Sequence, residues 1–205
     1  MIAHIVVPEG LAIATDKESG QCLLSDYYEA VLTQVIHSVT LNGQVFLAPG
    51  NRFDYPASEE QYAAEYLLSK RPDLNIFVVS GISYRTYLDT FDNANILRTW
   101  LQKQERWPLG KVNLYCNAPH YLRSAVMFRL CGFQVQSVIK CRPKEVFRKI
   151  VPRLWFYDYP IIQNLYELTT LIYNFGRWLM WKISPKTSPS NSLPAARYAN
   201  IQNSK

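Results

Sequence analysis

Two basic side chains, His120 and Arg123, are the residues best suited to chemistry in this 205-residue chain. They stand three residues apart at the start of a predicted helix, so they share one face beside helix-terminal N–H groups with partial positive charge. Such a corner attracts anions such as a phosphate, a carboxylate or a developing oxyanion. The simpler interpretation is that His120 only begins the helix and Arg123 pairs with a nearby carboxylate.

Two earlier segments carry comparable polar clusters, Ser58-Glu59-Glu60 and Asp89-Thr90-x-Asp92-Asn93. Both stand at predicted helix starts, where Ser and Thr are usually caps and acidic residues suit the helix dipole. Glu59 is the candidate to orient or neutralise His120 while the imidazole exchanges a proton. The three clusters together could bind a phosphorylated or carboxylated small molecule.

The elements that position these clusters are short apolar runs alternating with amphipathic stretches. Strands are predicted at residues 3–8, 44–48, 75–80, 111–116 and 133–139. Helices are predicted at residues 24–41 with Ser25 or Asp26 as the cap, at 58–71, from Thr90 to before Pro108, and from Pro119 to Cys131. This alternation predicts an α/β fold over residues 1–142, a Rossmann-like three-layer domain with a mainly parallel sheet of five strands.

In a parallel sheet every strand-to-helix loop leaves at the carboxyl edge, so the three clusters should converge there. The predicted site has His120 and Glu59 as catalytic residues and, as ligand contacts, Arg123, Ser58, Thr90, Asp92 and Asn93. No GxGxxG motif, Walker lysine or GxSxG elbow occurs, which disfavours a standard dinucleotide enzyme or serine hydrolase. No His/Cys group has zinc spacing, so no metal is expected.

The C-terminal third has a different character. Residues 140–205 hold 11 Lys and Arg against 3 Asp and Glu, a net charge of +8, whereas residues 1–139 have a net charge of −2. Within residues 143–183, steps of three and four predict an amphipathic helix from the apolar residues Ile161, Leu165, Leu168, Ile172, Phe175, Leu179 and Ile183. A stripe at this spacing is most often core, so the helix is expected to pack on the sheet or on a second subunit.

The alternative for this helix is a membrane interface, because Trp and Tyr residues interleave with cations around it. The residues concerned are Trp155, Phe156, Tyr157, Tyr159, Trp178 and Trp181, with Arg148, Lys149, Arg153, Arg177 and Lys182. Anionic lipid is then the predicted partner, and nucleic acid is disfavoured because no RNP, helix-turn-helix or OB signature occurs. The Ser/Pro/Asn-rich end, residues 184–205, is predicted to be disordered.

The four cysteines show no metal spacing, and three sit in apolar contexts, so they are expected to be buried thiols in a reducing compartment. The first residues lack the features of a secretory leader, and no run of 18 apolar residues occurs. The expected location is the cytoplasm, either free or peripheral at the inner face of the membrane.

The order and spacing of the polar motifs resemble the YdcF/SanA/ElyC-like bacterial proteins, a family of domains of unknown function. The segments similar to the family signatures sEA, T-x-E-N and H-x-x-R-A…Gf are Ser58-Glu59, Asp89-Thr90-x-Asp92-Asn93-Ala94 and His120-x-x-Arg123-Ser124-Ala125 with Cys131-Gly132-Phe133. The resemblance covers residues 1–180 and includes Glu167, an acidic residue in the final helix. It implies a Rossmann-like domain that binds a nucleotide or S-adenosylmethionine, and a link to the cell envelope. Without a preceding span, the chain looks closest to the soluble YdcF branch.

The chain departs from the family pattern at two turns, which read Val7-Pro8-Glu9-Gly10 and Ala48-Pro49-Gly50 where the family has glycine-rich sequences. Asp92 also replaces the usual Glu, and Glu60 replaces an Ala. These changes favour an alternative function, a non-catalytic module that binds a membrane or a partner through the basic, aromatic C-terminal helix.

Overall fold

The computed structural model describes residues 2–12, 23–52, 55–79, 87–143 and 159–184. The strands are β1 (Ala3–Val6), β2 (Leu11–Ala12), β3 (Leu23–Leu24), β4 (Gln44–Leu47), β5 (Asn75–Val78), β6 (Lys111–Asn117) and β7 (Gln134–Cys141). The helices are α1 (Asp26–Ser38), α2 (Glu59–Lys70), α3 (Thr90–Lys103), α4 (Tyr121–Leu130) and α5 (Pro160–Ile183).

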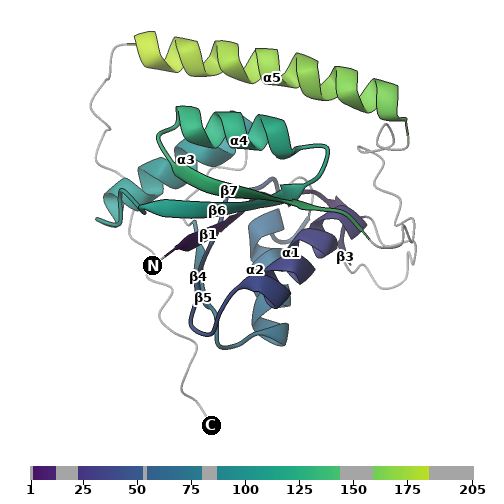
Figure 1. The fold of residues 1–205 in the computed structure, drawn as a ribbon, viewed down its shortest axis with the longest axis vertical. Coiled ribbons are helices and arrows are strands. Elements are labelled where there is room, and N and C mark those ends of the chain that lie inside the picture. Colours follow the sequence, from purple (N-terminus) through teal and green to yellow (C-terminus); the bar gives the residue numbers. More distant parts are fainter. Residues whose placement is uncertain (1, 13–22, 53–54, 80–86, 144–158, 185–205) are drawn as a thin grey trace.

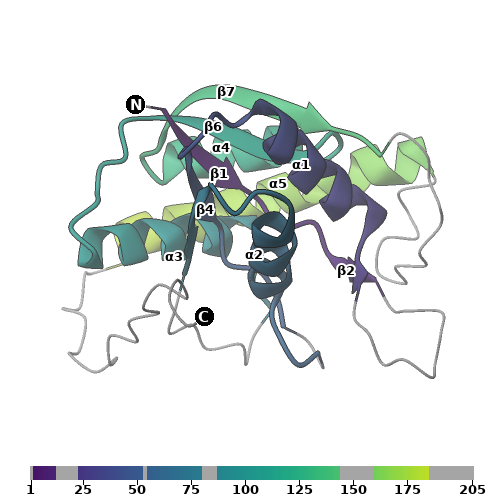
Figure 2. The same ribbon diagram turned by 90° about the horizontal axis from the view of Figure 1, so that it is seen from below.

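Five strands form one sheet in the order β5-β4-β1-β6-β7, and every neighbouring pair is parallel. Helices α1 and α2 cover one face of this sheet, and α3 and α4 cover the other (Figures 1 and 2). The predicted Rossmann-like α/β fold with a parallel sheet of five strands is thereby confirmed. Helix α5 lies outside α4, as an additional layer (Figure 1).

The central strands read as apolar runs because both of their faces are covered by helices. Successive side chains point to opposite faces of the sheet, so Ile5 and Phe46 join the core under α3 and α4. Their neighbours Val6, Val45 and Leu47 join the core under α1 and α2. All five side chains are fully buried, and this burial on both faces fixes the register of the sheet.

The region before α1 differs from the prediction. Leu23–Leu24 pairs antiparallel with Leu11–Ala12, so residue 24 belongs to a short strand rather than to the helix. Helix α1 begins at Asp26 because Ser25 is its cap, with the Ser25 hydroxyl oxygen accepting from the Tyr28 N–H at 3.0 Å. Pro119 likewise precedes α4 instead of entering it, and His120 is the N-cap residue of that helix.

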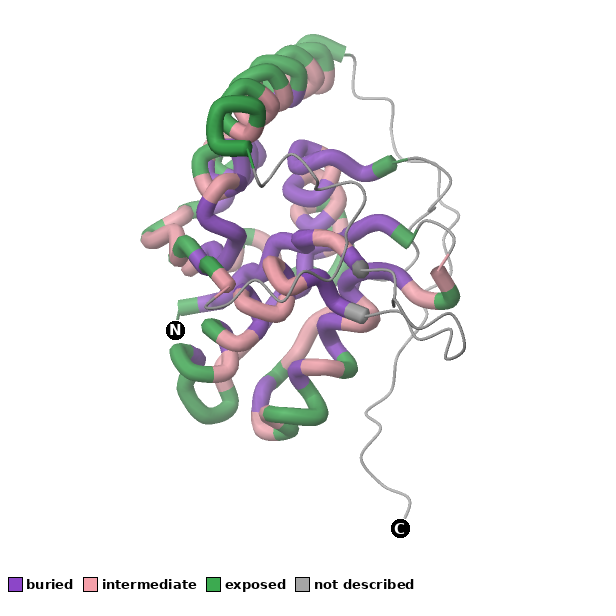
Figure 3. Tube along the Cα trace, turned by 90° about the vertical axis from the view of Figure 1, so that its right-hand side faces the viewer, coloured by how far each residue is buried: buried purple, intermediate pink, exposed green. Residues whose placement is uncertain are grey.

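Helix α5 exists as predicted, but the predicted apolar stripe does not pack on the chain's own domain. The seven apolar residues of the predicted stripe are 46% to 84% exposed, and Figure 3 shows this outer side of α5 as exposed. The helix packs on α3 and α4, with Leu171, Trp178 and Trp181 against their core. Polar side chains decide this orientation, because Glu167, Asn174 and Arg177 find hydrogen-bond partners only on that side.

Three cysteines, Cys116, Cys131 and Cys141, are buried free thiols as expected. Some predictions fall outside the described residues. They concern Cys22, the aromatic and basic residues between 148 and 157 that could contact a membrane, and the tail 185–205. Within the part of the chain that the structure describes, no helix has the length and apolarity needed to cross a membrane.

Candidate functional site

The candidate site lies where the chain leaves β1 and β6, two neighbouring strands of the sheet. The chain proceeds from β1 toward β4 and β5 on one side and from β6 toward β7 on the other. Such a reversal of strand order opens a crevice at the carboxyl edge of the sheet, which is where α/β proteins bind ligands. Glu9 follows β1, Asn117 ends β6, and His120 caps α4, so all three residues lie at this edge of the sheet.

A continuous row of buried hydrogen bonds links these strand ends to α3. The His120 imidazole contacts Glu9 Oε1 through Nδ1 at 3.1 Å and Thr90 Oγ1 through Nε2 at 2.9 Å. Arg123 Nη1 donates to the same Thr90 oxygen at 2.8 Å. The structure therefore brings Thr90 together with His120 and Arg123, as the sequence predicted. The partner of His120 Nδ1 is Glu9, which was not predicted.

Two groups that can only donate, the Arg123 guanidinium and the Asn117 N–H, stand at the two ends of this row. Because Arg123 donates to Thr90 Oγ1, the Thr90 hydrogen is free to point at His120 Nε2. The Asn117 N–H donates to Glu9 Oε1 at 2.7 Å, so that oxygen accepts there and can also accept from the His120 Nδ1–H. These contacts are compatible with the tautomer that carries its hydrogen on Nδ1 and leaves the Nε2 lone pair facing the Thr90 hydroxyl.

Burial also determines the charges of this row. It lowers the pKa of His120 to about 3, with a further contribution from the positive charge of Arg123. Burial raises the pKa of Glu9 to about 8, against the opposing effects of the Asn117 hydrogen bond and Arg123. Both shifts favour the neutral form of the group concerned, so burial disfavours an ion pair between Glu9 and His120.

The arrangement of Glu9, His120 and Thr90 has the order of a carboxyl group, an imidazole and a hydroxyl. In this order the imidazole can take a proton from the hydroxyl while the carboxyl group holds the ring in position. Arg123 beside the Thr90 oxygen would stabilise negative charge that develops there. The order of the groups is that of general acid–base chemistry, but with its pKa lowered to about 3 the imidazole is a weak base in this closed arrangement.

Arg123 is already matched by a carboxylate from the C-terminal helix. Its Nε and Nη2 atoms donate to the two oxygens of Glu167 at 2.9 and 3.0 Å, a bidentate pair in which both side chains are largely buried. An anionic ligand would therefore share Arg123 with Glu167. The simpler interpretation made from the sequence, in which Arg123 pairs with a carboxylate of the chain itself, is realised in the structure.

Comparison with known proteins gives no further assignment. No family model, curated protein or solved structure matches this chain. The chemistry of the site therefore has to be argued from its own residues.

The Ser58-Glu59-Glu60 segment forms the start of α2, after the turn that follows β4. Ser58 is the N-cap of α2 in the predicted capping box, with Gln61 Oε1 accepting from the Ser58 N–H at 2.9 Å. Glu60 Oε2 accepts from the Gly50 N–H at 2.8 Å. Glu59 is 4% exposed and packs so closely on Gly50 that an added Cβ there would lie 2.5 Å from its carboxylate. The proposed role of Glu59 in orienting His120 is wrong, because Glu9 and Thr90 hold both ring nitrogens.

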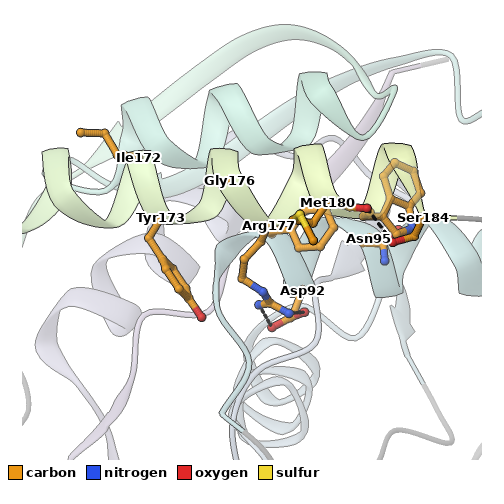
Figure 4. Close-up of a pocket in the computed structure, with 10 residues that line it drawn as sticks. Asp92, Asn95, Ile172, Tyr173, Gly176, Arg177, Met180 and Ser184 are labelled. Carbon is orange, nitrogen blue, oxygen red and sulfur yellow. Dashed lines mark hydrogen bonds and ion pairs between the residues drawn. The ribbon is translucent and has the colours of Figure 1, made fainter.

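The polar residues at the start of α3 have two kinds of contact: some cap the helix, and others bind neighbouring elements. Asp89, and not Thr90, is the N-cap, and Asp92 completes a capping box with it, which frees Thr90 to contact His120. Both Asp92 oxygens accept from Arg177 of α5, at 2.7 and 3.1 Å, so this carboxylate faces α5 (Figure 4). Asn93 Nδ2 donates to the Pro49 carbonyl and thereby ties α3 to the turn after β4.

Two buried side chains near Glu9 carry polar atoms without a hydrogen-bond partner among the described residues. They are the Tyr28 hydroxyl, which is fully buried, and both amide atoms of Asn117, which is 1% exposed. Burial raises the pKa of Tyr28, and the negative charges of Glu59, Glu60 and Glu9 raise it further. Unpartnered buried polar groups are uncommon and costly, and a bound ligand or water is the usual partner.

Glu9, Tyr28 and Asn117 were missed in the sequence. Glu9 and Asn117 could have been found by applying the carboxyl-edge rule to every strand, since one follows β1 and the other ends β6. Tyr28 gives no such signal, because it reads as a buried residue on the apolar face of α1. Among the described residues, no group of His, Cys, Asp and Glu is arranged to hold a metal ion.

Proposed function

We propose that this chain binds a small, nucleotide-like ligand at the carboxyl edge of its sheet, in the crevice between Glu9, Tyr28 and Asn117. The observation that carries this proposal is the set of unpartnered polar atoms on Tyr28 and Asn117. A hydroxyl-rich ligand such as a ribose or another sugar would satisfy them. Acidic side chains at a strand end suit such hydroxyls, as in dinucleotide-binding folds.

Each site residue then has a role toward the ligand. Thr90 and Asn117 hold polar groups, Arg123 attracts the anionic part while it remains paired with Glu167, and His120 exchanges a proton through Nε2. Any enzymatic step would be a proton transfer that uses the neutral imidazole. S-adenosylmethionine belongs to the same ligand class, since it combines a ribose with charged groups, and kinship with the YdcF-like proteins and their link to the cell envelope is part of this proposal.

A thermal-shift screen against nucleotides, sugar nucleotides, S-adenosylmethionine and polyprenyl-phosphate analogues tests the proposal. A ligand that binds the native fold raises the melting temperature with its affinity. The Tyr28→Phe variant removes only the unpartnered hydroxyl, and we expect it to reduce the shift without loss of fold. Tyr115→Phe is the matched control, because the Tyr115 hydroxyl contacts His4 and Ser38 instead. A shift that is equal in Tyr28→Phe, Asn117→Ala and wild type would contradict the proposal.

A second candidate function is a non-catalytic module that binds a membrane surface or a protein partner through α5. The observation that favours it is the exposure of the outward apolar face of this helix, where Ile161 is 84% and Ile172 is 64% exposed. Contiguous apolar surface of this kind marks an interaction site in most proteins. Co-sedimentation with anionic vesicles, or association with a protein, would support this function, and the absence of both would contradict it.

A further inference from the structure

We infer that the outward face of α5 binds the same face of a second copy of this chain, so that two α5 helices pack together in a symmetric dimer. The inference deepens the second candidate function and rests on it, because it names the partner of the same helix face. It is independent of the proposed ligand site.

The first argument is the spacing of the outward residues. Ile161, Leu165, Leu168, Ile172, Phe175 and Leu179 follow one another at steps of four, three, four, three and four residues. Steps that alternate in this way keep a seam of apolar side chains along one line of the helix, as in the paired helices of coiled coils. The seam runs through nearly the whole of α5, which is 24 residues long.

The second argument is the absence of exposed charge along this face. Between Pro160 and Trp181 the charged residues are Glu167 and Arg177, and both are bound to the domain itself, Glu167 by Arg123 and Arg177 by Asp89 and Asp92. A second copy therefore meets no like charge on the seam. Anionic lipid, by contrast, is usually held by Lys and Arg on the same helix, and the outward face offers none until Lys182.

The third argument is the size and shape of the surface. Ten apolar side chains of α5 are exposed: Ile161, Ile162, Leu165, Leu168, Ile172, Tyr173, Phe175, Leu179, Met180 and Ile183. Together they expose on the order of 1,000 Å², which is comparable to the roughly 800 Å² that each partner buries in a stable interface of standard size.

The surface beside the seam also has room for a partner side chain. Thr169 and Gly176 are exposed beside the seam, where their small side chains allow a second helix to approach closely. An open hollow of about 670 Å³ adjoins Ile172, Tyr173 and Met180, between α5 and α3 (Figure 4). A large apolar residue from the second copy could enter it.

Such an interface requires the same patch on both copies, related by a two-fold axis. Each α5 helix is fixed to its own domain by hydrogen bonds, so it can present a rigid surface to a second copy. Asn174 accepts from the Phe91 N–H at 2.8 Å, and Trp178 Nε1 donates to the Leu130 carbonyl at 3.1 Å. The association is thus expected to join two folded domains without rearrangement of either.

Sedimentation-velocity ultracentrifugation of the full chain over a range of concentrations tests the inference. We expect wild type to be a dimer and Ile172→Glu to be monomeric, with a dissociation constant raised roughly 100-fold, because the new charge would be buried without a partner. Leu41→Glu is the matched control, since Leu41 is 73% exposed but lies after α1, and it should remain dimeric. Equal circular dichroism and melting temperatures of the isolated chains would show that the variants fold.

A second measurement uses proximity instead of affinity. In either helix direction Ile172, near the middle of the seam, faces the seam of the second copy, so Ile172→Cys should form a disulfide-linked dimer under mild oxidation. Leu41→Cys and wild type should not. A dimer that persists in Ile172→Glu, or a linked species that forms equally in Leu41→Cys, would overturn the inference.

Vesicles of phosphatidylglycerol and phosphatidylcholine separate this inference from the function on which it rests. A monomeric wild type that co-sediments with them through α5, with loss of binding in Ile172→Glu, would overturn the dimer and leave the second candidate function standing as membrane binding. A monomeric wild type that binds neither vesicles nor a protein would overturn both.

Discussion

The guanidinium of Arg123 at the start of α4 forms two parallel hydrogen bonds with the carboxylate of Glu167 in α5, at 2.9 and 3.0 Å. The two residues are separated by 44 positions in the chain. The pair joins the candidate site to the C-terminal helix, because the same arginine also donates to Thr90. Helix α5 is therefore part of the support of the site and not an appendage to it.

Replacing Glu167 should destabilise the fold strongly. Glu167→Ala leaves the Arg123 charge largely buried without its partner, and removal of one member of such a pair costs about 3 kcal/mol or more. Glu167→Gln keeps an acceptor oxygen and should lose less. Urea denaturation measures the free energy of unfolding, with the exposed Glu65→Ala on α2 as the control. A loss no larger than that of Glu65→Ala would contradict the importance assigned to the pair.

The buried pair of Glu9 and His120 should give stability a broad maximum at mildly acidic pH. The folded pKa of Glu9, about 8, lies above its ordinary value of 4.5, so its contribution is complete below pH 4.5 and is lost as pH rises toward 8. The folded pKa of His120, about 3, lies below its ordinary value of 6.5, so its contribution is complete above pH 6.5 and is lost as pH falls toward 3. Between pH 4.5 and 6.5 the two effects oppose each other.

Two variants separate these slopes. Glu9→Gln should flatten the decline between pH 6.5 and 8, which amounts to at most about 1.4 kcal/mol per pH unit for one proton. His120→Gln should flatten the decline between pH 4.5 and 3. The exposed His37→Gln on α1 should leave both slopes as in wild type. Urea denaturation across this pH range is the measurement, and unchanged slopes in both site variants would contradict the assigned charges.

Two Tyr→Phe substitutions should change stability in opposite directions. Tyr28→Phe removes a buried hydroxyl without a partner among the described residues and should raise the free energy of unfolding by about 1 kcal/mol. Tyr115→Phe removes a hydroxyl that bonds His4 at 3.1 Å and Ser38 at 2.9 Å, and should lower it by about 1 kcal/mol. Thermal and chemical unfolding of the two variants in parallel would settle the sign. A loss in Tyr28→Phe equal to that in Tyr115→Phe would show that the Tyr28 hydroxyl has a partner in the apo protein.

Two Gly→Ala substitutions form a similar contrast. Gly50→Ala would place a methyl group 2.5 Å from the Glu59 carboxylate and 2.6 Å from its Cβ, so Glu59 and the start of α2 must move. A clear loss of stability is expected, together with a weaker ligand response. In the single chain Gly176→Ala faces open space within a helix, so it should stabilise the folded monomer by up to about 1 kcal/mol. Melting temperatures compared in the same buffer test the expected loss and the expected gain of stability. A Gly50→Ala variant as stable as wild type would contradict the close packing of Glu59 on Gly50.

The sequence by itself determined the elements and the architecture. Runs such as Ala3–Val6 and Gln44–Leu47 identified strands buried on both faces, and the capping box at Ser58 placed the start of α2. Alternation of strands and helices then implied a parallel sheet and a single carboxyl edge. These features were predictable because they depend on local periodicity, capping and chain connectivity.

Only the tertiary structure decided which polar group meets which. Glu9 faces His120 across 111 positions of the chain, and Asp92 turns to Arg177 across 85, and no local pattern encodes such pairings. The same holds for the face of α5 that packs inward. The opposite face packs on the domain because it carries Glu167 and Asn174, whose hydrogen bonds to Arg123 and Phe91 are made there, and leaving such polar groups buried without partners is costly.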